Sequence, residues 1–192
     1  MTVTPSVLDY VTHLSPPAHA ILCYESAETV RQVFISYLNG GREKNETVDV
    51  LSSSRETFNH FLQCIKYSSP LKEQNPINCI EMAEFSSKTN GIDYGRSLTL
   101  MKSRLNIVKK LGFTGLRIFT IANDYLDYAT PQEVLQLEQH WGQKFPYSIT
   151  IMCSYDLTRA EGKFDVVLLD LLKAHGTHIF TGLAGSDEDA PQ

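Results

Sequence analysis

Six short runs of apolar residues recur along the chain and predict six β-strands. They span residues 18–24, 47–51, 77–82, 114–121, 149–155 and 177–181. The runs at 114–121 and 149–155 are apolar at nearly every position, which is typical of strands buried on both faces in the middle of a parallel sheet. In such sheets ligands usually bind at the carboxyl ends of the strands.

Most gaps between these runs carry helical patterns with recognisable ends. Ser26, Ser53 and Thr130 are predicted N-caps, and the last two are followed three residues later by glutamate, as in a capping box. The pair at 40–41, Gly-Gly, is predicted to end the first of these helices. Two more helical patterns lie at 98–110, where the basic residues are expected on a solvated face, and at 164–174, which is apolar nearly all round and expected to be deeply covered. Residues 7–14 fit a helix or a strand equally well.

The alternation of strands with helices predicts a three-layer α/β fold, with a mostly parallel central sheet flanked by helices. A chain of 192 residues suffices for one such domain. We expect an N-terminal segment at 1–17, a single domain at 18–182 and an acidic flexible tail at 183–192.

The charge and the apolar content of the chain limit the partners and the location that we expect. The net charge is −5, and three acidic residues of the tail contribute to it, so the body offers no basic field for nucleic acid or an anionic membrane. Residues 1–17 lack the pattern of a signal peptide, and no run is long enough to span a bilayer. These features predict a cytoplasmic protein.

The sequence indicates no cofactor and no metal. The cysteines follow no metal-type spacing and are expected to be reduced, mostly buried side chains: Cys23, Cys64, Cys79 and Cys153. His175 and His178 lack the glutamate and the spacing of a zinc-binding helix, so we expect a solvated helix end there.

The turn after the first strand argues against nucleotide hydrolysis. A phosphate loop needs glycines, whose backbone amides approach the anion, and usually a lysine. Residues 23–28 instead carry Tyr24, Glu25 and Glu28. A Walker-type ATPase site is therefore excluded at this turn.

Five short motifs, in order and spacing, resemble the MEDS family, the methanogen/methylotroph DcmR sensory domains. The family's patterns are H-x-x-x-x-Y-E, G-x-x-G-L-R, Y-E-x-x-L, L-C-x-Y-D and LLDLLxxH. The matching positions here are His19–Glu25, Gly112–Arg117, Glu138 with Trp141 at the leucine, 152–156 and 168–175. The resemblance covers residues 18–181.

The resemblance implies a sensory domain with a RecA/KaiC-like fold and a degenerate nucleotide site. Such domains occur in transcription regulators and signalling proteins and are thought to sense small hydrocarbon derivatives. The sequence departs from the family at 120–125, where an acidic residue and a tryptophan are usual. No DNA-binding or kinase module fits in the remaining residues, so we expect the output to pass through another protein.

The leading interpretation is a ligand pocket at the carboxyl edge of the sheet. Aromatic and sulfur side chains would supply apolar contact, and polar side chains would orient one polar group. The candidates are Tyr24, Tyr125, Cys153 and Tyr155 for the first role and His19, Glu25, Arg117, Asn123 and Asp156 for the second. Replacing Tyr155 with alanine is then expected to abolish ligand binding and leave the fold intact.

Each candidate also has a structural interpretation. Arg117 and Asp156 fit a pairing with each other or with other buried charges, and the alternation of the strand can turn the Tyr155 ring into the core. His19 fits an ordinary hydrogen-bonded histidine.

Two other functions remain open. A degenerate RecA-like fold could serve as a ligand-free interaction or self-assembly module, which a large exposed apolar patch would favour. An enzyme would need a strand-end carboxylate or a cysteine with a shifted pKa in a cleft, and we expect no catalysis.

Overall fold

The computed structural model describes residues 3–64, 77–87, 91–127, 129–144, 148–160 and 167–181. All six predicted strands are present and form one parallel sheet in the order β3-β2-β6-β7-β1-β8. Their bounds are β1 Ala18–Tyr24, β2 Glu46–Ser52, β3 Ile77–Glu81, β6 Gly115–Ile121, β7 Ile149–Asp156 and β8 Thr177–Phe180. As predicted, β6 and β7 lie at the centre.

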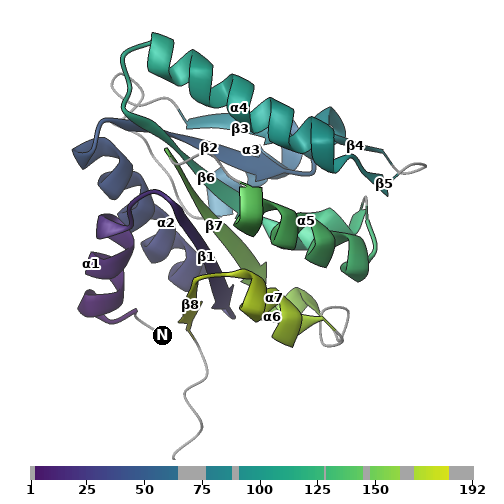
Figure 1. The fold of residues 1–192 in the computed structure, drawn as a ribbon. Helices are drawn as coiled ribbons and strands as arrows, with labels where there is room; N and C mark the ends of the chain where they lie inside the picture. Colours follow the sequence, from purple (N-terminus) through teal and green to yellow (C-terminus); the bar gives the residue numbers. More distant parts are fainter. Residues whose placement is uncertain are drawn as a thin grey trace, which may run out of the picture.

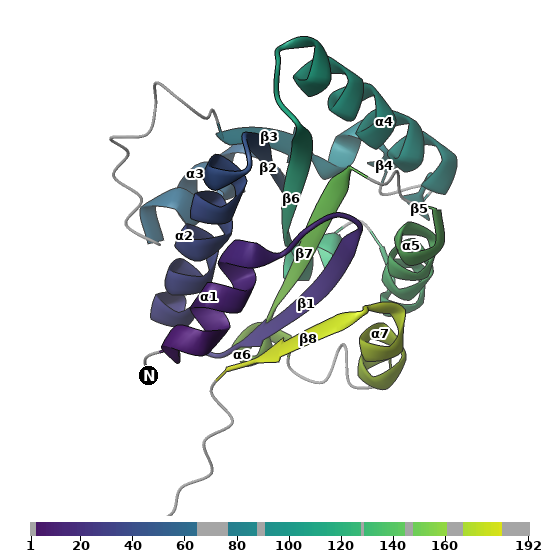
Figure 2. The ribbon, with the colours of Figure 1, turned by 60° about the vertical axis from the view of Figure 1, so that its left-hand side comes forward.

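Helices cover both faces of the sheet, which confirms the three-layer α/β class (Figures 1 and 2). One face carries α1 Pro5–His13, α2 Ala27–Glu43 and α3 Arg55–Cys64; the other carries α4 Tyr94–Lys110, α5 Pro131–Lys144 and α7 Leu168–Ala174. Short elements fill the connections: η1 Met82–Glu84, β4 Ser86–Ser87, β5 Gly91–Ile92, η2 Ala122–Asp127 and α6 Leu157–Ala160. Residues 7–14, which fitted a helix or a strand, belong mostly to α1. No helix in the described part of the chain is long and apolar enough to cross a membrane.

The pleat of the strands divides the core into two halves. On β7, Ile151, Cys153 and Tyr155 face α4, α5 and α7, whereas Met152 faces α1, α2 and α3. Successive side chains of a strand point to opposite faces, so a strand in the middle of a three-layer fold is apolar at most positions. A polar side chain there needs a buried partner, as Arg117 of β6 has in Glu46. Burial on both faces explains the nearly continuous apolar runs.

Two of the three predicted helix starts are confirmed. The Ser26 hydroxyl accepts from the backbone N–H of Thr29, and Thr130 and Glu133 form the reciprocal capping pair. The predicted cap at Ser53 is wrong by one residue. Ser54 caps α3, because the Ser53 hydroxyl instead donates to a buried carboxylate, that of Asp124.

The prediction that the glycine pair ends its helix is wrong. Helix α2 continues through Gly40 and Gly41 to Glu43. A Cβ built on Gly40 would overlap the backbone carbonyl of Thr12 in α1. The glycine therefore lets two helices approach closely.

Replacing Gly40 with alanine is expected to destabilise the protein, because α1 must shift to make room for the methyl group. The matched control is Gly95→Ala in the first turn of α4, where an added Cβ meets its nearest neighbour at 3.5 Å, an ordinary contact. That control should be neutral or stabilising by up to about 1 kcal/mol, since alanine favours helix. Urea unfolding of both variants checks the prediction, and equal effects would contradict it.

Two further predictions need correction. The apolar helix predicted at 164–174 is α7, whose described part begins at Leu168, and Leu169 is 66% exposed, so α7 is not covered all round. Arg104, expected on the solvated face of α4, forms an ion pair with the buried Asp49 of β2 at 2.8 Å. The tail at 183–192 and residues 164–166 lie outside the described residues.

Candidate functional site

The structure distributes the predicted ligand-binding residues over four places. Tyr24 and Asp156 line a cavity at the carboxyl edge of the sheet, with Glu25 and Asn123 beside it. His19 and Cys153 belong to a buried polar cluster with Glu138 and His175, between the sheet and the helices of the other face, and Tyr155 donates to that cluster. Tyr125 is buried in the core, edge-on to the Trp141 ring, and Arg117 lies in another part of the fold.

Arg117 is a structural residue rather than a neighbour of the other candidates. Its guanidinium is fully buried and donates to the Glu46 carboxylate at 2.7 Å. It also donates to backbone carbonyl groups of Leu14 and Tyr37, and stacks on the Tyr37 ring. Of the two pairings that the sequence left open, the pairing with another buried charge is the one observed.

The cavity at the carboxyl edge opens between the strand ends and three helices. Tyr24, Ile121 and Asp156 end β1, β6 and β7, and all three line it. Its volume is about 220 Å³. The remaining lining residues come from α2, α3 and α6: Ala27, Val30, Thr57, His60, Phe61, Cys64 and Arg159. We call this cavity the carboxyl-edge pocket.

Polar groups connect the strand ends beside the pocket. Asn123 and Asp156 are joined by two hydrogen bonds, from the Asn123 amide to the Asp156 carbonyl and from the Asp156 N–H to the Asn123 side chain. The neighbouring Asp124 accepts from Ser52 and from Ser53. Burial raises the pKa of Asp124, and the hydrogen bonds from the serines act in the opposite direction. The strand ends are thus held together by a buried polar network.

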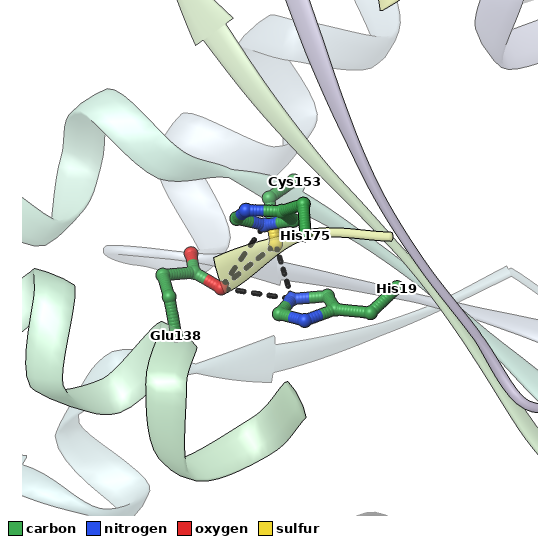
Figure 3. A group of neighbouring side chains, drawn as sticks. All are labelled: His19, Glu138, Cys153 and His175. Carbon is green, nitrogen blue, oxygen red and sulfur yellow. Dashed lines mark hydrogen bonds and ion pairs between the residues drawn. The ribbon is translucent and has the colours of Figure 1, made fainter. Parts of the chain in front are cut away.

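The buried polar cluster is built from four elements (Figure 3). His19 comes from β1 and Cys153 from the adjacent strand β7, and both point to the same face of the sheet. Glu138 reaches them from α5, and His175 follows the end of α7. All four side chains converge on one point, with the Glu138 carboxylate at the centre of their contacts.

The distances within the cluster are short. Oε2 of Glu138 lies 3.0 Å from Nε2 of His19, 3.2 Å from Sγ of Cys153 and 3.5 Å from Nε2 of His175. Sγ of Cys153 is 3.5 Å from Nε2 of His19. One carboxylate oxygen therefore faces three polar atoms from three other elements.

Neighbouring groups orient the ring of His175 and the carboxylate. Nδ1 of His175 lies 2.6 Å from the carbonyl oxygen of Leu171, which can only accept, so Nδ1 carries the hydrogen. The Tyr155 hydroxyl donates to the second carboxylate oxygen, Oε1 of Glu138, at 3.0 Å. These contacts fix the groups in one arrangement.

The environment shifts several pKa values in the cluster. Burial lowers the pKa of His19, and the neighbouring His175 ring lowers it further, against the raising effect of Glu138. Burial alone would raise the pKa of Glu138, but the two histidines hold it well below its usual range. Burial, with the nearby carboxylate, raises the pKa of Cys153 and of Tyr155 well above their usual ranges. The carboxylate is therefore ionised inside the protein.

Sequence reasoning missed two members of this cluster as site residues. The expectation of a solvated helix end holds for His178, which is exposed, but is wrong for His175, which is buried. Glu138 and His175 are separated from His19 by more than a hundred residues, so no local spacing reveals them. The one available signal was that both stand in the motifs that resemble a known family.

The four cysteines differ in burial more than the sequence predicts. Cys23 and Cys153 are buried, whereas Cys64 is exposed and Cys79 is half-buried, and all four are free thiols. Burial raises the pKa of Cys23 and of Cys79 to about 11. These two are therefore protonated at neutral pH and poor nucleophiles.

Comparisons with known proteins agree with this architecture. The family model MEDS, the MEthanogen/methylotroph, DcmR Sensory domain, matches residues 18–176. The chain belongs to the MEDS family. The match includes the three strand ends of the carboxyl-edge pocket and all four members of the polar cluster. It identifies the chain as a sensory domain and confirms the family suggested by the motifs.

A solved structure supports the fold of this MEDS domain. It comes from Pyrococcus horikoshii OT3, described as a structural study of Project ID PH0250, and has a TM-score of 0.60. The superposition covers 92% of this chain and 87% of the other at 9% sequence identity. At that identity the likeness shows a shared fold alone. No curated protein matches the sequence.

Proposed function

We propose that this MEDS domain is a non-catalytic sensor that binds a small, mainly apolar molecule in the carboxyl-edge pocket. The signal then passes to a separate output protein, such as a transcription regulator or a kinase. The observation that carries the proposal is the convergence of Tyr24, Ile121 and Asp156 on one cavity, at the ends of three strands. Parallel sheets commonly bind ligands at this edge.

The size and lining of the pocket favour a small ligand. A volume of about 220 Å³ lies below the range of roughly 300–1,000 Å³ that is usual for drug-sized ligands. An apolar cavity of about 150 Å³ is enough for benzene. Val30, Phe61 and Ile121 supply apolar contact, whereas Asp156 and Arg159 supply opposite charges. A short hydrocarbon chain or ring with one polar atom fits this combination.

In the RecA/KaiC-like relation that the motifs suggest, the turn between β1 and α2 would be the degenerate nucleotide site. The Ser26 hydroxyl at the start of α2 is used to cap the helix, and the exposed Glu25 precedes it. A phosphate group would meet a carboxylate where a phosphate loop offers amides and a lysine. We therefore expect ADP and ATP to bind weakly or not at all.

Filling the pocket tests the proposal. Ala27 lines the pocket from the exposed first turn of α2, so Ala27→Trp should fill the cavity with little effect on the core. A panel of small halocarbons, methylamines, alcohols and nucleotides is screened by thermal shift. A ligand at 100 times its Kd should stabilise the wild-type protein by about 2.7 kcal/mol, and the shift should vanish in the variant.

The control is Asn39→Trp, which adds the same ring at an exposed position of α2 outside the pocket. It should keep the full thermal shift. A ligand that stabilises both tryptophan variants equally would place its site elsewhere. Absence of any shift, together with a stable dimer in sedimentation, would favour the alternative of a self-assembly module.

One observation favours that alternative. Strand β8 is at the edge of the sheet, and the groove between it and α1 is lined by Tyr10 and Phe180, both about half exposed. An unpaired edge strand with aromatic neighbours is suited to pairing with another chain. Sedimentation of Phe180→Glu would then show dissociation to monomers.

A further inference from the structure

The buried polar cluster suits a metal ion and shares no residue with the carboxyl-edge pocket. We propose that His19, Glu138, Cys153 and His175 bind one divalent transition-metal ion of the zinc class. Each contributes one ligand atom, and the four atoms lie within 4.8 Å of one another. Figure 3 shows the side chains pointing to a common centre.

The spacing of the four atoms agrees with tetrahedral coordination. Metal–ligand bonds of about 2.0–2.3 Å place the ligand atoms of a tetrahedron about 3.3–3.8 Å apart. The distances around the cluster are 3.0, 3.2, 3.5 and 3.5 Å. The other two pairs lie within 4.8 Å, so the side chains would move closer together on that side to complete the tetrahedron.

The hydrogen positions leave a lone pair directed at the centre of the cluster. Nδ1 of His175 donates to Leu171, so Nε2 carries a lone pair in the neutral form of the ring, the form that binds a metal ion. That atom is fully buried, has no hydrogen-bond partner among the described residues, and faces a carboxylate oxygen at 3.5 Å. In that form two lone pairs face each other away from water, and a cation between them, a proton or a metal ion, removes the repulsion.

Charge balance agrees with a divalent ion. A carboxylate and a thiolate together carry two negative charges, two neutral imidazoles carry none, and a divalent cation neutralises the set. Isolated charges inside proteins are costly, so a neutral closed site is far easier to bury. The thiol proton leaves on binding, because a coordinated cysteine is deprotonated.

The surroundings are those of a supported metal site. Metal-binding histidines commonly donate their second ring N–H to a carbonyl, as His175 does to Leu171, and ligating carboxylates are commonly hydrogen-bonded, as Glu138 is by Tyr155. Gly142 lets α5 approach the end of α7 closely, because a Cβ there would lie 2.9 Å from the Ala174 carbonyl oxygen.

The ligand set selects the ion and its role. Imidazole and thiolate ligands favour zinc and similar transition metals over magnesium or calcium. Four protein ligands leave no open position, which is typical of structural rather than catalytic zinc. The ion would therefore tie α5 and the end of α7 to β1 and β7, and stabilise that side of the sensor.

Cobalt provides the direct test, since Co²⁺ substitutes for Zn²⁺ and reports thiolate coordination by a charge-transfer absorption band. The full chain is expressed in medium supplemented with Co²⁺ and studied by native mass spectrometry and absorption. We expect one ion per chain and a thiolate-to-cobalt band. Cys153→Ala should abolish the band and weaken binding by more than the roughly 10- to 100-fold caused by losing a supporting residue.

Cys23→Ala is the matched control, because Cys23 is a buried cysteine on β1 that faces the same half of the core and lies outside the cluster. It should keep both the ion and the band. Folded wild-type protein with neither Co²⁺ nor Zn²⁺ would overturn the proposal, whether or not the variants fold. A band that persists in Cys153→Ala would also overturn it.

Discussion

Arg117→Met is expected to lower the free energy of unfolding by about 3–5 kcal/mol, because it leaves the buried Glu46 carboxylate without its ion-pair partner. The backbone carbonyl groups of Leu14 and Tyr37 lose a donor in the same step. Urea unfolding followed by circular dichroism measures the loss.

The control for Arg117 is the same substitution in an exposed ion pair. Arg31 donates to Glu28 on the surface of α2, where water screens the interaction, so Arg31→Met should change the stability little. Arg117→Lys should be intermediate, since lysine keeps the charge but loses the planar set of donors. Equal losses for Arg117→Met and Arg31→Met would contradict the structural role assigned to the buried pair.

Tyr155→Ala is expected to destabilise the protein by about 3–5 kcal/mol, the range for truncating a large buried aromatic side chain. The sequence suggested that this variant would abolish ligand binding and leave the fold intact. The structure changes that expectation, because the Tyr155 ring is in the core and its hydroxyl donates to the buried Glu138.

Tyr155→Phe separates the two contributions. It keeps the ring and removes only the hydrogen bond to a charged group, so a loss of about 1.5–3 kcal/mol is expected. Thermal and urea unfolding of both variants give the values. If Tyr155→Ala unfolds no more readily than the wild-type protein, Tyr155 does not have the core position described above.

The inner strands β1, β2, β6 and β7 could be predicted because burial on both faces leaves a nearly continuous apolar run, which is a strong local signal. The edge strands β3 and β8 are only partly buried and give a weaker one. The helix starts at Ser26 and Thr130 were equally local, since each cap bonds within its own first turn. The prediction that the glycine pair ends its helix was wrong because Gly40 serves a contact with α1, which approaches α2 from another part of the chain. Local patterns predict local bonds and do not predict such close approaches.

The candidate site was predicted only in outline. The carboxyl edge of the sheet was identified from the strand ends, and Tyr24 and Asp156 do line its pocket. Side chains alternate along β7, so Cys153 and Tyr155 face the half of the core opposite to that of Met152 and Tyr24, away from the pocket. The polar cluster depends on β1, β7, α5 and α7 meeting in space, so residue spacing does not reveal it.

Strands β1 and β7 connect the two sites. The carboxyl-edge pocket lies on the side of α2 and α3, and the polar cluster lies on the side of α5 and α7. Under the two proposals, the metal ion would hold one side of the sheet and the ligand would bind on the other.

The central claim is that a small ligand binds at the carboxyl edge of the sheet, and amide NMR titration tests it most directly. Chloroform, 1-butanol and trimethylamine are titrated separately into the ¹⁵N-labelled chain, with ATP as the comparison. For at least one small probe, saturable shifts should centre on Tyr24, Val30, Phe61 and Ile121 and disappear in Ala27→Trp. Shifts centred on residues 176–180 instead, or no saturable shift with any probe, would contradict the account.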